Sequence, residues 1–211
     1  MKLPLVGRGR DRWPKLAIAK TSRHPVHENI YKNVDNIIKM VLQAIKYERG
    51  KLLVLDQLQL PHAEVYDEVH NSTDAWHAIK EMRTRGAPAI AIVAALGLAV
   101  ELANGKVSDI AEEVKVFIHE KLDYLVTSRP TAVNLADAAR KLGRIVDAAA
   151  AETNPTGTSI KDAYIKAAEK MLVDDVSDNE AIGKHGADWI LNNTEPAKTG
   201  QVSVVTHCNT G

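Results

Sequence analysis

The sequence has a single cysteine, which excludes an internal disulfide framework and any zinc site built from several cysteines. It also lacks a P-loop, a dinucleotide-binding fingerprint and a nucleophile elbow. No secretory signal is recognisable, because the first apolar stretch, residues 3–6, is too short. The longest apolar run, residues 87–100, is mostly alanine and lacks the length and bulk of a membrane span. We therefore expect a cytoplasmic protein with no membrane partner, with the nucleus as an alternative location.

Charge is balanced over the whole chain, with 27 Lys and Arg against 27 Asp and Glu, so we expect no nucleic-acid partner. The balance is uneven along the chain: residues 1–39 hold nine basic and three acidic side chains, and the rest is mildly acidic. Residues 1–39 show no helical or strand period. We interpret them as a disordered extension, with a basic nucleic-acid arm or a targeting leader as alternatives.

From residue 40 onward the pattern predicts a β-hairpin followed by helices. Residues 41–60 are typical of two strands around a turn at 48–51, ended by Pro61. Three further expectations concern helix starts: Thr73 caps the first helix, Ser108 the third, and Ser159 with Asp162 forms a capping box. The expected helices cover about 73–83, 87–103, 108–122, 132–151, 159–172 and 179–191.

The composition changes near the end of the chain. Residues 192–200, "NNTEPAKTG", are typical of a linker, and a strand is expected over 201–208. The fold class is therefore a mostly α domain over 40–191, with a small β-hairpin at its start. Residues 201–211 are interpreted as the beginning of a second, α/β domain that is truncated after its first strand.

The first candidate site is "TRGAPAI", residues 84–90. Pro88 favours a helix start at Ala87 or Pro88, and Gly86 allows a close approach to the backbone. Free amides of Gly86 and Ala87, the helix dipole and the guanidinium of Arg85 would together suit a phosphate. The alternative is a tight turn into a buried helix with a surface arginine.

The second candidate is "SRPTAVN", residues 128–134. Arg129 again precedes a proline that is expected to start a helix, so an anion could be bound by Arg129 and the amides beyond Pro130. Either arginine alone is weak evidence for an anion-binding site. Two turns of the same construction suggest that two helix ends point at one ligand.

The third candidate is Cys208 in "VVTHCNTG". A thiol at the carboxyl end of a strand lies where amide dipoles can lower its pKa, which would make it a useful acid, base or nucleophile. The alternative is a small buried hydrophobic residue. The other histidines lack metal-ligand spacing, and no metal site is expected.

Taken together in this order, "TRGAPAIAIVAALGLAVEL", "SRPTAVNLADAARKL" and "VVTHCNTG" resemble the methylthioribose-1-phosphate isomerases of methionine salvage. The resemblance runs from residue 40 to 211 and leaves out 1–39. The broader family includes regulatory subunits of translation initiation factor 2B and ribose-1,5-bisphosphate isomerases.

The resemblance implies an isomerase, an intramolecular oxidoreductase that converts 5-methylthioribose 1-phosphate into 5-methylthioribulose 1-phosphate without a metal or organic cofactor. It implies substrate binding by Arg85, Gly86, Ala87 and Arg129, and a catalytic role for Cys208 in proton transfer or transition-state stabilisation. It also implies that residues 201–211 start a Rossmann-like catalytic domain, and that the full-length protein is a homodimer.

The resemblance also implies residues that this chain does not contain. The proton-donating aspartate of the family lies well beyond the position of Cys208, as do further substrate-binding residues. We therefore expect this polypeptide to be truncated and inactive by itself. Two alternatives remain: a non-catalytic regulatory or assembly module related to initiation factor 2B subunits, and a structural fragment that pairs with a complete subunit.

Overall fold

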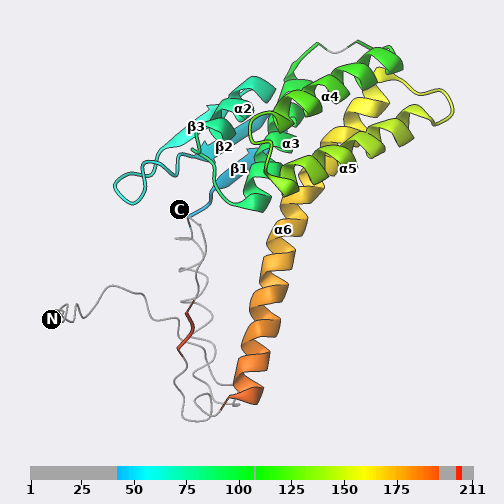
Figure 1. Ribbon diagram of the computed structural model, residues 1–211. Helices are drawn as coiled ribbons and strands as arrows, with labels where there is room; N and C mark the ends of the chain where they lie inside the picture. The colour runs from blue at the N-terminus through cyan, green and yellow to red at the C-terminus, as the bar shows by residue number, and fades with distance from the viewer. Residues whose placement is uncertain (1–41, 107, 195–202, 206–211) are drawn as a thin grey trace.

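An antiparallel sheet opens the part of the chain that the computed structural model describes, residues 42–106, 108–194 and 203–205 (Figure 1). Its strands are β1 (Ile45–Glu48), β2 (Lys51–Leu55) and β3 (Tyr66–Val69), in the order β1-β2-β3. Glu48 pairs with Lys51 across a two-residue turn in which Gly50 has a φ of 87°. The predicted hairpin is thus confirmed.

The second predicted strand is too long, and a third strand was not predicted. β2 ends at Leu55 because the buried carboxylate of Asp56 folds the chain into a turn, accepting hydrogen bonds from Leu58 N at 3.0 Å and Gln59 Nε2 at 3.2 Å. The chain then returns as β3, whose Tyr66 pairs with Leu55.

Five helices follow in the described residues: α2 (Ser72–Lys80), α3 (Ala87–Asn104), α4 (Ala111–Val126), α5 (Val133–Ala150) and α6 (Gly157–Asn193). Helix α3 is the central one. It packs on α2, α5, α6 and β2, and twelve of its residues are buried. An 18-residue helix of this kind is apolar enough to cross a membrane, but here 67% of it is buried inside the fold. Its burial on nearly all sides confirms the sequence-based expectation.

Three of the predicted helix starts are wrong in detail. Asn71 rather than Thr73 caps α2, because its side chain accepts the hydrogen bond from Asp74 N at 2.9 Å. Helix α4 begins at Ala111, after Ile110, and the Ser108 hydroxyl accepts only from Ile110 N. In α6 the capping box is formed by Thr156 and Ser159, three residues earlier than predicted.

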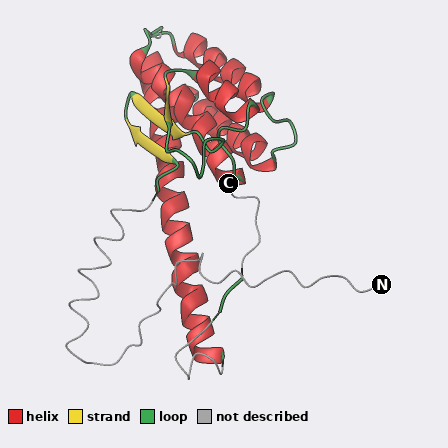
Figure 2. Cartoon of the chain, turned by 90° about the vertical axis from the view of Figure 1, so that its left-hand side faces the viewer, coloured by secondary structure: helices red, strands yellow, loops and turns green. Residues whose placement is uncertain are grey.

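Helix α6 is one continuous helix of 37 residues, not two (Figure 2). The segment between the two predicted helices, 173–178, contains Asp and Ser but no glycine or proline, so nothing in it breaks the helix. The first half of α6 packs against α3, α4 and α5, and the second half extends beyond the bundle.

The apolar face of α6 continues past the bundle. Because about 18 residues make five turns of an α-helix, residues 18 apart lie on the same face. Tyr164, Ile165 and Ala168 are buried in the bundle. Their counterparts 18 residues later are Ile182, Gly183 and Gly186; Ile182 is 70% exposed, and a Cβ on either glycine would meet no atom within 4 Å.

The sheet is attached to α6 by one carboxylate. Glu169 accepts hydrogen bonds from the Tyr47 hydroxyl at 3.0 Å, from Arg49 Nε at 2.9 Å and from Arg49 Nη2 at 2.6 Å. The bonds from Arg49 are the largest influence that holds the pKa of Glu169 below its ordinary value. The hairpin is therefore held against the helix at its turn.

The start of α6 gives a first testable prediction. A Cβ on Gly157 would lie 2.2 Å from the Ser108 carbonyl oxygen and 2.8 Å from Val114 Cγ2. Gly157→Ala should therefore lower the free energy of unfolding by about 1–3 kcal/mol, as overpacking does. Gly183→Ala, in open space on the same helix, should raise it by about 0.5–1 kcal/mol. Urea unfolding of both variants checks this, and equal effects would contradict the packing at Gly157.

Candidate functional site

The turn between α2 and α3 carries the first candidate residues. Gly86 is the N-cap of α3, with φ 93° and ψ 131°, and Ala87 is the first helical residue. Pro88 lies in the first turn, so the predicted helix start is confirmed. In the described residues no backbone carbonyl accepts a hydrogen bond from the amides of Gly86 or Ala87. Two amides at the positive end of a buried helix are thus available to an anion.

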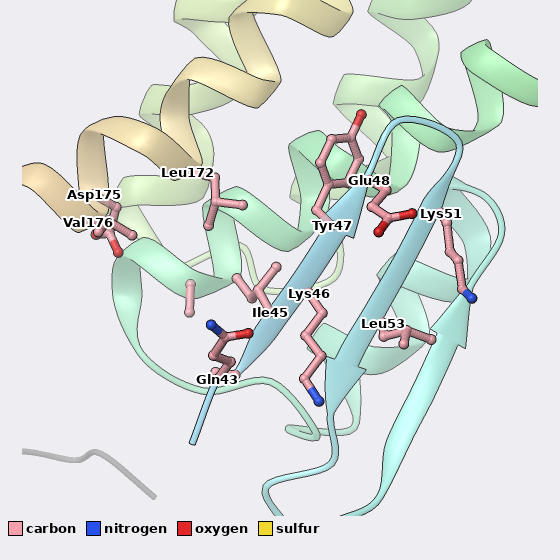
Figure 3. Close-up of a pocket in the computed structure, with 12 residues that line it drawn as sticks. Gln43, Ile45, Lys46, Tyr47, Glu48, Lys51, Leu53, Leu172, Asp175 and Val176 are labelled. Atoms are coloured by element: carbon pink, nitrogen blue, oxygen red, sulfur yellow. The ribbon is translucent and has the colours of Figure 1, made fainter. Parts of the chain in front are cut away.

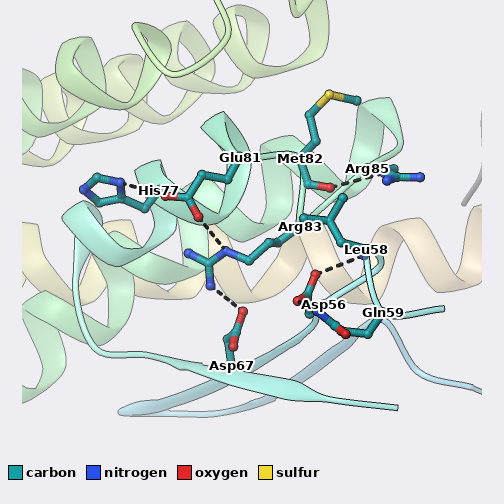
Figure 4. Close-up of polar contacts among 9 residues, drawn as sticks. All are labelled: Asp56, Leu58, Gln59, Asp67, His77, Glu81, Met82, Arg83 and Arg85. Carbon is teal, nitrogen blue, oxygen red and sulfur yellow. Dashed lines mark hydrogen bonds and ion pairs between the residues drawn. The ribbon is translucent and has the colours of Figure 1, made fainter. Parts of the chain in front are cut away.

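Arg85 is anchored to its own turn. Its Nε donates to the Met82 carbonyl at 3.2 Å, and its side chain lies on the other side of the turn from Arg83 (Figure 4). Met82 has a φ of 61°, which is uncommon for a residue other than glycine. The turn therefore holds two residues with left-handed φ, Met82 and Gly86, on either side of Arg85.

The second candidate turn differs from the prediction. Pro130 does not start a helix: α5 begins at Val133, with Ala132 as its N-cap. The reason is a separate turn in which Ala132 N donates to the Arg129 carbonyl at 2.9 Å. Ser128 is buried and donates its hydroxyl to Leu125 O at 2.7 Å, closing the end of α4. Arg129 is half-buried, just outside the first turn of α5.

One side chain connects the two helices that lead into these turns. Trp76 of α2 stacks on Tyr124 of α4, with ring centroids 5.8 Å apart, and donates Nε1 to Thr127 Oγ1 at 2.8 Å. Thr127 precedes Arg129 by two residues, and α2 leads directly into the turn of Arg85. That Arg85 and Arg129 bind the same ligand stays a prediction.

Cys208, the third candidate, lies outside the described residues, as do its neighbours His207 and Asn209. Of the strand predicted over 201–208, only Ser203–Val205 are described, and they are exposed and in no regular structure. Among the described residues no group of three His, Cys, Asp or Glu side chains could hold a metal ion.

A groove that the sequence did not predict lies between β1, the middle of α6 and the first turn of α3 (Figure 3). Its volume is about 680 Å³. Ile45 and Leu53 contribute apolar surface from the sheet, and Leu172 and Val176 contribute it from α6. Ala89 also lines it, so the groove borders the first turn of α3. Its walls come from three distant segments, and only Ala89 belongs to a candidate motif.

Comparison with known proteins identifies the family of the chain. Residues 83–211, more than half of the chain, match the model of the initiation factor 2 subunit family. The chain belongs to this family. Within it, the chain is 74% identical over 172 residues to methylthioribose-1-phosphate isomerase of Pyrenophora tritici-repentis, which covers 82% of this chain and 44% of that protein. The isomerase of Aspergillus clavatus is 58% identical over 176 residues, or 46% of its length.

Solved structures show the same likeness. A crystal structure of 5-methylthioribose 1-phosphate isomerase from Pyrococcus horikoshii matches with a TM-score of 0.63 and 28% identity, covering 70% of this chain and 40% of that one. The delta subunit of initiation factor eIF-2B from A. fulgidus matches with a TM-score of 0.55 and 30% identity, covering 64% and 38%. The resemblance found in the sequence is thus confirmed. The chain spans less than half the length of the curated relatives it matches.

The conformation of Gly86 gives a second testable prediction. A Cβ there would have space, since its nearest neighbour is Ala89 Cβ at 3.9 Å, but the φ of 93° is strained for any L side chain. Gly86→Ala should cost about 1–3 kcal/mol of stability through the backbone alone. Gly186→Ala, at a helical glycine in open space, should instead be stabilising. Thermal unfolding distinguishes them; a neutral Gly86→Ala would show that the turn is not held in this conformation.

Proposed function

We propose that this chain supplies the phosphate-binding part of an aldose–ketose isomerase that converts 5-methylthioribose 1-phosphate into 5-methylthioribulose 1-phosphate in methionine salvage. The observation that carries the proposal is the free amide pair of Gly86 and Ala87 beside Arg85, in a chain 74% identical to a protein named as this isomerase. The proposal requires no metal or organic cofactor.

The reaction needs a fixed anchor for the substrate. The bond between C1 and the ring oxygen breaks, and that oxygen takes up a proton. The hydrogen on C2 moves to C1, and C2 becomes a carbonyl by losing its hydroxyl proton. The phosphate on C1 does not react but lies one bond from the reacting carbon. Holding it at the start of α3 would therefore fix C1 and C2 against the groups that move the protons.

Two kinds of donor would bind the phosphate. The amides of Gly86 and Ala87 add the positive end of α3, and Arg85 and Arg129 add guanidinium groups that suit a phosphate dianion. We assign Cys208 to the reacting carbons, as the resemblance implies. Arg85 and Arg129 would bind the phosphate equally in the substrate and in the transition state. Cys208 would act on the hydrogen transfer between C2 and C1.

A second part of the proposal is that the chain needs further polypeptide for turnover. It spans less than half the length of its relatives, and beyond the bundle the same face of α6 carries Ile182, which is 70% exposed, and Trp189, which is 63% exposed. Exposed large apolar side chains on one face are a feature of interaction surfaces. We propose that the other half of a longer chain covers this face, and that the complete protein is a homodimer.

The alternative function is a non-catalytic regulatory or assembly module. The likeness to the delta subunit of initiation factor eIF-2B, at a TM-score of 0.55, favours it. Such a module could bind a sugar phosphate through Arg85 and Arg129 but would not need the thiol of Cys208. In a longer protein that contains this chain and is active, loss of turnover in a Cys208→Ser variant that still binds phosphate would separate the two functions.

The activity itself provides the third testable prediction. The chain alone should form no ketose 1-phosphate from 5-methylthioribose 1-phosphate. A chimera that continues it with the unmatched remainder of the Pyrenophora tritici-repentis isomerase should be active. In that chimera Arg85→Gln and Arg129→Gln should each lower kcat/KM by about 100-fold, because each removes a charge-assisted contact to the phosphate.

Arg140→Gln serves as the control, since Arg140 is an exposed residue of α5 that pairs with Asp137. It should leave kcat/KM within about twofold of the parent. Turnover by the chain alone, well above background, would refute the requirement for further polypeptide. An unchanged kcat/KM in both arginine variants would refute the phosphate site.

A further inference from the structure

The turn that carries Arg85 must be held in place by its surroundings. It runs from Glu81 to Gly86, and two of its residues, Met82 and Gly86, have left-handed φ values of 61° and 93°. For Met82 this conformation costs free energy, so it persists only where other contacts require it. The same turn presents the amides of Gly86 and Ala87, and its conformation therefore decides where those donors point.

Arg83 makes the side-chain contact between this turn and the sheet (Figure 4). Its Nη1 donates to Asp67 Oδ2 on β3, and its Nε donates to Glu81 Oε2 at 3.1 Å. The Arg83 side chain is 23% exposed. Partial burial works to lower the pKa of Arg83, but the two carboxylates raise it above its ordinary value. The planar guanidinium of Arg83 thus joins two carboxylates, that of Glu81 at the beginning of the turn and that of Asp67 on the sheet.

The peptide unit that joins Arg83 to Thr84 is also held, at its carbonyl and at its amide. Its carbonyl accepts a hydrogen bond from Gln57 N at 2.9 Å, and Thr84 N donates to Ala78 O at 3.1 Å. Thr84 is buried and lies directly before Arg85. The guanidinium and the backbone of Arg83 therefore restrain the turn from the sheet side. Arg85, whose Nε donates to the Met82 carbonyl, lies on the other side of the turn.

We propose that Arg83 is a positioning residue of the phosphate site: through Asp67 and Glu81 it sets the conformation of the turn that aims Arg85 and the amides of Gly86 and Ala87. Arg83 touches no substrate in this scheme. The inference rests on the proposed function in that it takes these donors to be the phosphate ligands. The claim that Arg83 sets the positions of those donors does not depend on any ligand.

A purely structural ion pair would behave differently, and the chain contains a matched control. Arg49 also uses two guanidinium nitrogens, both on the carboxylate of Glu169, but it joins the β1–β2 turn to α6 and takes no part in the 81–86 turn. Replacing either arginine by lysine keeps the charge and removes the fork geometry. If only the Arg83 variant loses affinity for phosphate, the loss must come from a change in the turn, because both variants lose a contact made through two guanidinium nitrogens.

The test is heteronuclear NMR of the chain and of its Arg83→Lys and Arg49→Lys variants, before and during titration with inorganic phosphate. Arg83→Lys should shift the signals of the Gly86 and Ala87 amides and of Arg85 Nε, and should raise the Kd for phosphate at these amides at least fivefold. Asp67→Asn should reproduce both effects. Arg49→Lys should change neither.

Each other outcome counts against a definite part of the scheme. If the Gly86 and Ala87 signals of Arg83→Lys coincide with those of the parent, or move as much in Arg49→Lys, Arg83 does not position the turn. If they move while the Kd for phosphate stays the same, Arg83 is only structural. If the parent chain shows no phosphate response at these amides, the proposed phosphate site fails, and the unliganded shifts still decide whether Arg83 sets the turn.

Discussion

The burial of α3 is the constraint on which the rest of the structure depends. A helix with no polar face must be surrounded, and α2, α5, α6 and β2 surround it. Contacts without spare volume fix its position: a Cβ on Gly97 would lie 2.5 Å from Ala75 Cβ, and the buried Tyr164 hydroxyl donates to Ala95 O at 3.2 Å. These contacts hold the middle of α3 in place, and its exposed first turn, with the amide of Ala87, continues from that fixed part.

The sheet and helix α6 make different contributions to the surroundings of the start of α3. The sheet restrains the 81–86 turn through Asp67 and Arg83, and the first turn of α3 borders the groove that β1 and α6 form. Helix α6 then carries the apolar face of the bundle beyond it, where Ile182 is 70% exposed. To the first of these features, the turn before α3, we assign phosphate binding, and to the second, the exposed face of α6, contact with a further polypeptide.

The sequence predicted the elements whose signals are local and missed those set by tertiary contacts. Helix α3, the β1–β2 turn and the Gly86 helix start follow from apolar runs, glycine and proline. Strand β3, "YDEV", is half polar and forms because β2 offers it a partner. Arg85, Gly86 and Ala87 are candidates that follow from one motif, whereas the pairing of Arg83 with Asp67 joins residues 16 apart and has no sequence signature.

The central claim is that the turns before α3 and α5 bind one phosphate group together. The most direct measurement is an NMR titration of the chain with 5-methylthioribose 1-phosphate, followed at the amides of Gly86 and Ala87 in one turn and Val133 and Asn134 in the other. All four signals should shift along curves that share a single Kd. Different Kd values for the two turns, or a response at only one of them, would contradict a shared phosphate site.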